Sequence, residues 1–364
     1  MKILKKIVLS VHILAALPLL ACYVAPHVNP ASFMWLVPFT FVFHYVIAIN
    51  IFFIFVWVLL DRRVLLFAIP LVLAGLPLIN AMIPLRAMAT SRPSGDNHFR
   101  LMTYNVHVFG LYNWRQKDVT KFEMFRYIEA EKPDIACFQE YFYDSGGFFP
   151  TTDSLLQILN IKNYHQVFTA SSAKTQHFGI ATFSRFPIVC RGELLFENTH
   201  NLCIYTDLVV DNDTIRVYNC HLQSMYFDED NYLEMQQFSE TNLPDQDLKP
   251  YRNILKKVLK ASQRRSDQAI MLRRHVDTCP YHVIVCGDFN DNPFSYTYQK
   301  VSKGLRDSFS AAGKGFGYTW SQKGIKQRID FVLYSDKFEC SRHQAFKVPY
   351  SDHYPIVVRL GLKK

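Results

Sequence analysis

The residues with the clearest chemical potential follow an apolar run near the C-terminus. Residues 283–286 are apolar and mostly β-branched, which predicts a buried strand that stops at Gly287. Asp288 and Asn290 come next, on a turn that ends at Pro293. A carboxylate can orient or deprotonate a water molecule, and carboxylate and amide oxygens suit Mg²⁺. This strand end is therefore the first candidate for a catalytic site.

Four further motifs place polar side chains within or just after β-rich apolar runs. They are Asn105 in 103–105, Glu140 in 138–140, His221 in 218–222, and Asp330 with Asp352 and His353 in 328–330 and 351–353. Each motif alone is weak, because a solvated carboxylate, a structural histidine or an Asx-turn is the commoner explanation. Their joint presence in one order makes a shared site the better interpretation.

Together these motifs resemble the endonuclease/exonuclease/phosphatase superfamily. This superfamily of metal-dependent phosphoesterases includes DNase I, neutral sphingomyelinases and inositol-polyphosphate 5-phosphatases. The resemblance runs from Phe99 to the C-terminus and keeps the order of all the motifs. It implies an α/β fold, the four-layer αββα sandwich, and a phosphoric ester hydrolase that depends on Mg²⁺, with Mn²⁺ as an alternative metal.

The resemblance also implies roles for the polar residues. Glu140 would be the direct metal ligand, and Asn105 and Asp352 would complete or flank the same site. Asp288 would orient or deprotonate the attacking water, and Asn290 would donate to the phosphate. The alternative for this last pair is an Asx-turn in which both side chains bond only their own backbone.

Histidines complete the implied site. His353 would lie against the scissile phosphate while Asp330 accepts a hydrogen bond from the other ring nitrogen, and His221 would be a second phosphate-facing imidazole. One position departs from the abasic-site endonuclease branch, which commonly has Asp where this chain has His107. DNA repair is thereby less expected, and His107 is interpreted as a surface histidine that could also touch substrate.

Alternating strands and helices must position these residues. Apolar patterning predicts strands at 100–108, 134–142, 178–183, 202–210, 214–220, 317–321, 329–334 and 356–360, and helices at 119–131 and 251–276. The strands at 202–210 and 214–220 are expected to form a hairpin across 211–213. Two loops are candidates for substrate specificity: the aromatic segment 141–150, either exposed or buried, and the acidic segment 225–250 as a lid.

Three uncharged apolar runs precede this domain. They cover residues 7–25, 33–60 and 64–85, and each is long enough for a membrane-spanning helix. A cleaved signal peptide is the alternative for the first run, but its boundary lacks a clear cleavage site before the next apolar run. Residues 1–87 are therefore expected to be a membrane anchor with three transmembrane helices, residues 88–98 a linker, and 99–364 the catalytic domain.

Basic residues suggest how the anchor is oriented. Lys2, Lys5 and Lys6 precede the first run, and Arg62 and Arg63 separate the second from the third, whereas residues 26–32 contain no Lys or Arg. The positive-inside rule then places the N-terminus in the cytoplasm. With three spans, the catalytic domain would be extracytoplasmic, on a chain integral to the inner or plasma membrane and held in the bilayer through residues 7–85.

The net charge of +9 does not by itself indicate a nucleic-acid partner. Residues 1–97 hold seven Lys/Arg and two Asp/Glu, so about half of the excess lies in the anchor and only +4 remains for the domain. The eight cysteines include no C-x-x-C pair, so they predict neither a zinc site nor a full disulfide framework.

These observations rank the possible functions. A phosphodiester in a phospholipid or sphingolipid head group is the first expectation, because the anchor would hold the enzyme at its substrate. An extracytoplasmic DNA or RNA endonuclease is second, since nucleic-acid affinity depends on neutralising several phosphates. The third possibility is an inert, membrane-tethered binding module. The complete set of polar residues argues against the third.

Overall fold

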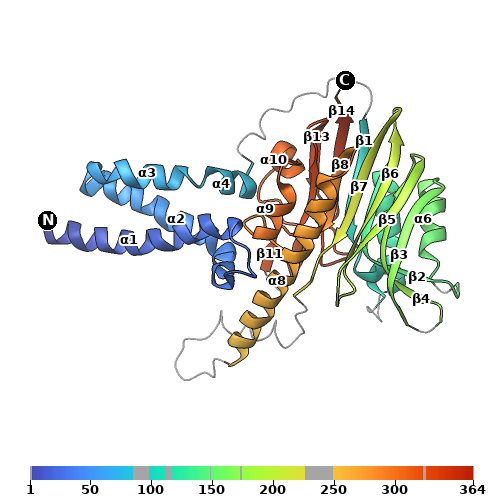
Figure 1. The fold of residues 1–364 in the computed structure, drawn as a ribbon, viewed down its shortest axis with the longest axis horizontal. Helices are drawn as coiled ribbons and strands as arrows, with labels where there is room; N and C mark the ends of the chain where they lie inside the picture. The colour runs from blue at the N-terminus through green and yellow to red at the C-terminus, as the bar shows by residue number, and fades with distance from the viewer. Residues whose placement is uncertain are drawn as a thin grey trace.

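The computed structural model describes residues 2–84, 98–111, 117–147, 149–172, 174–225, 249–322 and 325–363. Two six-stranded sheets pack face to face, and helices cover their outer faces (Figure 1). The predicted αββα sandwich is therefore confirmed. The N-terminal helices project from one side of it.

The first sheet has the order β13-β14-β1-β2-β4-β3. Its strands are β1 (His98–Asn105), β2 (Ile135–Asp144), β3 (Asn163–Ser172), β4 (Gln176–Ser184), β13 (Phe338–Ala345) and β14 (Ile356–Leu362). The central pair, β1 and β2, is parallel, and the other neighbours are antiparallel.

The second sheet has the order β5-β6-β7-β8-β12-β9. Its strands are β5 (Ile188–Leu195), β6 (Leu202–Val210), β7 (Asp213–His221), β8 (His282–Asp288), β9 (Arg306–Asp307) and β12 (Asp330–Tyr334). Here too the central pair, β7 and β8, is parallel. The carboxyl ends of both parallel pairs thus become available for a site.

Side-chain alternation creates the core between the sheets. Phe99 and Leu101 of β1 point to the same inner cluster as Ile284 and Cys286 of β8 and Val332 of β12. The intervening residues of these strands face outward into two other clusters. Period-two alternation thus fixes which face each later residue of a strand will occupy.

Helices bury the outward faces. The first sheet is covered by α5 (Lys117–Glu131) and α6 (Thr151–Leu159), and the second by α8 (Lys249–Asp277), α9 (Tyr296–Ser302) and α10 (Ser308–Ala312). A two-stranded ribbon of β10 (Trp320–Gln322) and β11 (Ile325–Gln327) completes the domain. The hairpin of β6 and β7 and the helices at 117–131 and 249–277 agree with the sequence predictions.

Two strands are shorter in the structure than the sequence predicts. The first strand was expected to reach residue 108 but ends at Asn105, where the 3₁₀ turn η4 (His107–Gly110) follows. The strand expected at 317–321 begins only at Trp320. Strands β3, β5, β9, β11 and β13 were not predicted.

The anchor contains two helices that are long and apolar enough to cross a membrane. The spans Lys2–His27 and Met34–Leu60 combine α1 (Lys2–Val24) and α2 (Val37–Leu60) with the short turns η1 (Ala25–His27) and η2 (Met34–Leu36). The third apolar run is not one straight helix. After η3 (Arg62–Val64) it forms α3 (Leu65–Leu73) and α4 (Leu76–Met82), bent by 51°. Gly75 and Pro77, at this break, explain the interruption.

Polar contacts hold the anchor helices together. Trp57 donates to Nδ1 of His12 over 2.9 Å, and Asn50 donates to the carbonyl oxygen of Ala15 over 3.1 Å. Tyr23 donates to the carbonyl oxygen of Leu71 over 2.8 Å. The first two bonds join α1 to α2 and the third joins α1 to α3, which is how polar residues commonly serve between apolar helices.

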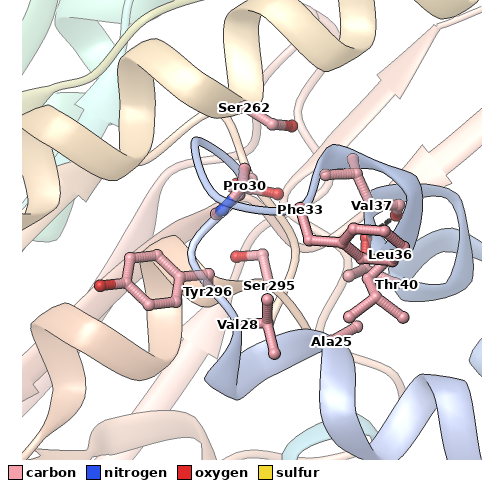
Figure 2. A pocket seen from close by; sticks show the side chains of 11 residues that line it. Ala25, Val28, Pro30, Phe33, Leu36, Val37, Thr40, Ser262, Ser295 and Tyr296 are labelled. Carbon is pink, nitrogen blue, oxygen red and sulfur yellow. Dashed lines mark hydrogen bonds between the residues drawn. The ribbon is translucent and has the colours of Figure 1, made fainter.

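The anchor also packs directly on the domain. Figure 2 shows the segment from Ala25 to Thr40 against Ser262 of α8 and against Ser295 and Tyr296 at the start of α9. Residues 85–97, which include most of the predicted linker, lie outside the described part of the chain. The predicted domain limits, 1–87 and 99–364, remain a prediction, although β1 begins at His98.

Candidate active site

Strand alternation carries three polar residues to the inner edge of the sandwich. Asn105 continues the inward series of Phe99 and Leu101, and Asp288 continues that of Ile284 and Cys286. Asp330 begins β12 on the face later occupied by Val332 and is paired in register with Asp288. All three are at most 2% exposed. The predicted residues of both sheets therefore meet at one edge.

Gly287 allows the two central strands of the second sheet to approach closely. Its φ is +126°, and an added Cβ would lie 2.0 Å from the carbonyl oxygen of Cys220 on β7. Only glycine avoids both problems. The residue before Asp288 thus lets His221, at the end of β7, stand opposite Asp288 in the parallel register.

Glu140 reaches the site through an irregularity in β2. Gln139 faces inward, so simple alternation would turn Glu140 outward. The register of β2 against β4 instead shifts between Phe138 and Tyr141, and Glu140 adopts a φ of +50°. Such a bulge redirects a side chain. As a result, the Glu140 carboxylate lies beside Asn105.

Asn105 links the two sheets. Its Nδ2 donates to Oε1 of Glu140 over 3.1 Å and to Oδ2 of Asp288 over 3.0 Å. Its Oδ1 accepts the backbone N–H of His107 over 3.1 Å. In this structure the side-chain amide of Asn105 therefore donates to two carboxylates and holds them together, and its oxygen accepts a bond from the backbone of His107.

A layer of buried, hydrogen-bonded side chains supports Asn105 and its two carboxylate partners. Gln139 donates to Oγ1 of Thr103 and, over 2.6 Å, to Oδ1 of Asn219. Asn219 in turn donates to the carbonyl oxygen of Ala181 over 2.9 Å. All of these side chains are buried, so the floor of the site is fixed by side-chain bonds between the sheets.

His353 is oriented as the sequence interpretation expects. Its Nδ1 lies 3.0 Å from Oδ2 of Asp330, and its Nε2 lies 3.7 Å from Oδ2 of Asp288. Burial alone would lower the pKa of His353, but the negative charges of Asp330 and Asp288 raise it well above its ordinary value. The two carboxylates thus favour the protonated form of the ring.

Asp288 is the deepest carboxylate of the group. Burial raises its pKa to about 6, with the charge of His353 opposing that rise and the charge of Asp330 adding to it. Its Oδ1 accepts the backbone N–H of Asn290 over 2.8 Å. The Asx-type bond that the sequence left as an alternative therefore exists, together with the contacts that Asp288 makes across the site.

Asn290 also bonds within the protein. Its Nδ2 donates to the carbonyl oxygen of Leu222 over 2.9 Å and to Oδ2 of Asp288 over 3.2 Å. It has a φ of +52°, in the left-handed region that asparagine tolerates. In this arrangement Asn290 steadies Asp288, and its predicted role as a phosphate donor stays a prediction.

His221 points an unpaired nitrogen into the cluster. Its buried Nε2 has no hydrogen-bond partner among the described residues and lies 3.8 Å from Oε1 of Glu140 and 3.8 Å from Oδ2 of Asp288. A buried polar atom without a partner is costly unless a ligand completes it. This geometry suits an imidazole that contacts a bound anion.

His107 belongs to the site, which the sequence interpretation undervalued. Its Nδ1 lies 3.2 Å from Oδ1 of Asp352 and 3.7 Å from Oε2 of Glu140. A hydrogen bond to Asp352 raises the pKa of His107. Trp320, which the sequence interpretation did not include, donates to Oδ2 of Asp352 over 3.1 Å. Burial would raise the pKa of Asp352, but His107 and His353 lower it.

The carboxylates fit a divalent cation. Glu140 and Asp352 each place a carboxylate oxygen near the same nitrogen of His107, so hard oxygen donors from two elements face one position. Asp288, Asp330 and His353 also bring one ligand atom each to within 4.8 Å of one another. The predicted ligands Glu140 and Asp352 are thus suitably placed, whereas the amide oxygen of Asn105 is engaged elsewhere.

The aromatic loop at 141–150 is mainly structural. Tyr141, Phe142 and Phe149 are at most 1% exposed and pack in the core behind the first sheet. Of the two interpretations of this segment, the buried one therefore holds at these three positions, and they do not form an exposed membrane-binding tip. Most of the predicted acidic lid, residues 226–248, lies outside the described part of the chain.

Comparison with known families gives two matches. The model of the endonuclease/exonuclease/phosphatase family matches residues 102–353, and that of a domain of unknown function matches residues 5–82. The first match spans every candidate site residue. No curated protein matches the chain significantly.

Solved structures share the fold at low sequence identity. An endonuclease/exonuclease/phosphatase from Bacteroides vulgatus has a TM-score of 0.53 at 15% identity, covering 74% of this chain and 100% of that one. A humanized D. rerio TDP2 has a TM-score of 0.53 at 15% identity, with 73% and 100% covered. The human Nocturnin catalytic domain with bound sulfate has a TM-score of 0.50 at 21% identity, with 73% and 94% covered.

Proposed function

This chain belongs to the endonuclease/exonuclease/phosphatase family, and from that premise we propose that it is a metal-dependent hydrolase of phosphodiesters in phospholipid or sphingolipid head groups. The observation that carries the proposal is the convergence of His221, His353 and Asn105 on Asp288 and Glu140. Two imidazoles beside paired carboxylates can bind a phosphate and activate a water molecule.

Glu140 and Asp352 would hold the divalent cation, Mg²⁺ or Mn²⁺. When bound, such a cation neutralises phosphoryl oxygens and stabilises the charge that develops on them. The convergence of these carboxylates on Nδ1 of His107 supports this role, since it shows that oxygens from two separate elements face one position.

The protein's own groups account for the rest of the reaction. Asp288 accepts the proton of the attacking water, whose oxygen forms the new bond to phosphorus as the ester P–O bond breaks, and the leaving oxygen takes up a proton from solvent. His353 and His221 donate hydrogen bonds to the phosphoryl oxygens. Asp330 keeps Nε2 of His353 directed at the reacting group by accepting from Nδ1.

The anchor supports a membrane-borne substrate. Two helices are long enough to cross a bilayer, and the segment between them packs on α8 and α9 of the hydrolase domain. An enzyme fixed at the bilayer meets lipid phosphodiesters at high local concentration. We infer an extracytoplasmic domain from the basic residues before α1 and after α2 together with a third crossing by the bent pair α3 and α4, since two crossings alone would return the chain to the cytoplasm.

Substrate class can be tested on the full-length chain in lipid nanodiscs with Mg²⁺. The panel is bis(4-nitrophenyl) phosphate, nanodiscs that contain phosphatidylcholine or sphingomyelin, and single-stranded DNA. We expect lipid hydrolysis that Asp288→Ala abolishes and Asp213→Ala, at the exposed start of β7, leaves intact. Faster hydrolysis of DNA than of lipid would replace this proposal with a nuclease. Inactivity on the whole panel, unchanged by Asp288→Ala, would support a binding module.

Orientation has a separate test that uses a native thiol. Cys190 on β5 is exposed, so a membrane-impermeant maleimide added to intact expressing cells should label it if the domain is extracytoplasmic. Cys190→Ser is the control for labelling elsewhere. Labelling that appears only after the cells are lysed would place the domain in the cytoplasm.

A further inference from the structure

An open cavity of about 760 Å³ lies where the anchor meets the hydrolase domain. One wall is formed by Thr40, Phe41, His44 and Tyr45, in the first turns of α2, together with residues 81–83 at the end of α4. The other wall is formed by residues 292–294 and by side chains from 316–328. The volume is in the range of sites that bind small molecules.

Specific contacts hold the two walls together. Arg328 donates through Nη2 to the carbonyl oxygen of Ala81 over 2.9 Å, and its Nη1 is paired with Asp307. The rings of Phe43 and Phe294 pack with centroids 4.7 Å apart. Since Arg328 and Phe294 are also nearly buried, the cavity belongs to a packed junction between the anchor and the domain.

The cavity changes character from one wall to the other. The α2 wall is aromatic and belongs to a helix that can span a membrane, and Tyr45 remains 65% exposed. The domain wall adds polar side chains, namely Asn292, Lys326 and Gln327. An amphiphile would match this lining, with its apolar part between α2 and the aromatic side chains of Phe294, Phe316 and Tyr318, and its polar part beside Lys326 and Gln327.

The domain wall is joined to the catalytic cluster by short stretches of chain. Asn292 follows Asn290 by two residues and Arg328 precedes Asp330 by two, so each wall residue has its Cα within about 8 Å of the catalytic residue's Cα. Thr319, beside the lining residue Tyr318, also accepts the backbone N–H groups of Ile329 and Asp330 through Oγ1. The same short segments of chain therefore carry residues of the cavity wall and residues of the catalytic cluster.

We propose that this cavity binds one acyl chain of a membrane phospholipid and so brings the lipid's phosphodiester to the catalytic cluster. The bilayer around α2 supplies the apolar occupant, and the cation of Lys326 suits the phosphate at the polar end. The delivery step rests on the proposed function, whereas the binding of the acyl chain does not.

Photolabelling tests the binding step without catalysis. Full-length Asp288→Ala protein is placed in dioleoylphosphatidylcholine nanodiscs with a phosphatidylcholine that carries a diazirine near the end of one acyl chain. After irradiation, mass spectrometry should find adducts on residues 292–294 and 316–318. Ile83→Trp, which fills the cavity, should reduce these adducts at least tenfold. Ile69→Trp, the same change on α3 outside the cavity, should not.

Two outcomes would overturn the proposal. Adducts confined to the anchor helices would show that the acyl chain stays outside the cavity. Adducts on the domain wall that persist in Ile83→Trp would show contact from another side. Excess glycerophosphocholine separates head-group from acyl binding, because it should not displace the probe.

The delivery step is measured by a ratio of rates on the active enzyme. Ile83→Trp should lower hydrolysis of phosphatidylcholine relative to bis(4-nitrophenyl) phosphate at least tenfold, and Ile69→Trp should leave that ratio unchanged. Labelling of the cavity in a protein that hydrolyses neither substrate would reject the proposed function and keep the lipid site. Hydrolysis of lipid without labelling of the cavity would keep the proposed function and reject the lipid site.

Discussion

The side-chain amide of Asn105 on β1 donates to the carboxylate of Asp288 on β8 over 3.0 Å. These residues come from different sheets and are separated by 183 positions. The same Nδ2 also donates to Glu140. One amide therefore keeps the proposed metal ligand and the proposed base at a fixed separation.

Replacing this donor by an acceptor tests the arrangement. Asn105→Asp puts a third carboxylate between Asp288 and Glu140 in place of a shared donor. We expect hydrolysis of bis(4-nitrophenyl) phosphate to fall by about 10²-fold or more, a typical effect of losing one well-placed donor. Asn198→Asp makes the same chemical change at an exposed turn and should be neutral. A threefold or smaller effect at Asn105 would show that the bridge is dispensable.

Asp330 and His353 should behave as one unit. Asp330→Asn removes the carboxylate that orients the ring, and we expect kcat to fall by roughly 10²- to 10⁴-fold. The double variant with His353→Ala should be no slower than His353→Ala alone, because Asp330 acts through that ring. Additive losses in the measured kcat values would mean that Asp330 has an independent role.

Metal removal tests the two carboxylates that converge on His107. EDTA should abolish hydrolysis, and Mg²⁺ or Mn²⁺ should restore it. Glu140→Gln and Asp352→Asn should each raise the Mg²⁺ concentration for half-maximal rate by about tenfold or more, since each removes a hard anionic ligand. Glu193→Gln, exposed on β5, controls for loss of charge. Full activity in EDTA would exclude this metal role.

Regular alternation explains why part of the site could be predicted from sequence. Residues 283–286 form a buried strand, and counting by two from Ile284 places Asp288 on the inner face, where the structure has it. In β12, counting back by two from Val332 places Asp330 on the same inner face. Local pattern sufficed where the backbone stayed regular.

Irregular backbone explains what the sequence pattern did not reveal. Glu140 faces the site only because β2 bulges, and His107 begins a run of three non-glycine residues with positive φ that continues through Val108 and Phe109. No glycine or proline marks the bulge, and only Gly110, which follows Phe109 with a positive φ, marks the turn. The bend after α3 did have a signal, since Gly75 and Pro77 interrupt the apolar run. Strands β3 and β5 lie at sheet edges and lack a clean alternation of buried and exposed residues.

Acid stability should depend on a histidine remote from the site. His343 on β13 bonds Ser308 and is buried, and burial lowers its pKa to about 4, with Asp307 opposing and Arg328 adding to the effect. The unfolded chain, with a histidine pKa of about 6.5, then binds more protons than the folded chain between these values. The contribution of His343 to the free energy of unfolding is therefore complete above about pH 6.5 and is lost as the pH falls towards 4.

Thermal unfolding of the full-length protein in detergent, measured at pH 7.5 and pH 5, checks this prediction. The shift in pKa corresponds to at most about 3 kcal/mol of the free energy of unfolding. His343→Gln keeps a hydrogen-bonding group near Ser308 but cannot take up a proton, so the drop in Tm between the two pH values should shrink. His282→Gln, at the exposed start of β8, controls for loss of an imidazole. An unchanged drop in His343→Gln would assign the acid sensitivity to other groups, beginning with buried His165, whose pKa burial also lowers to about 4.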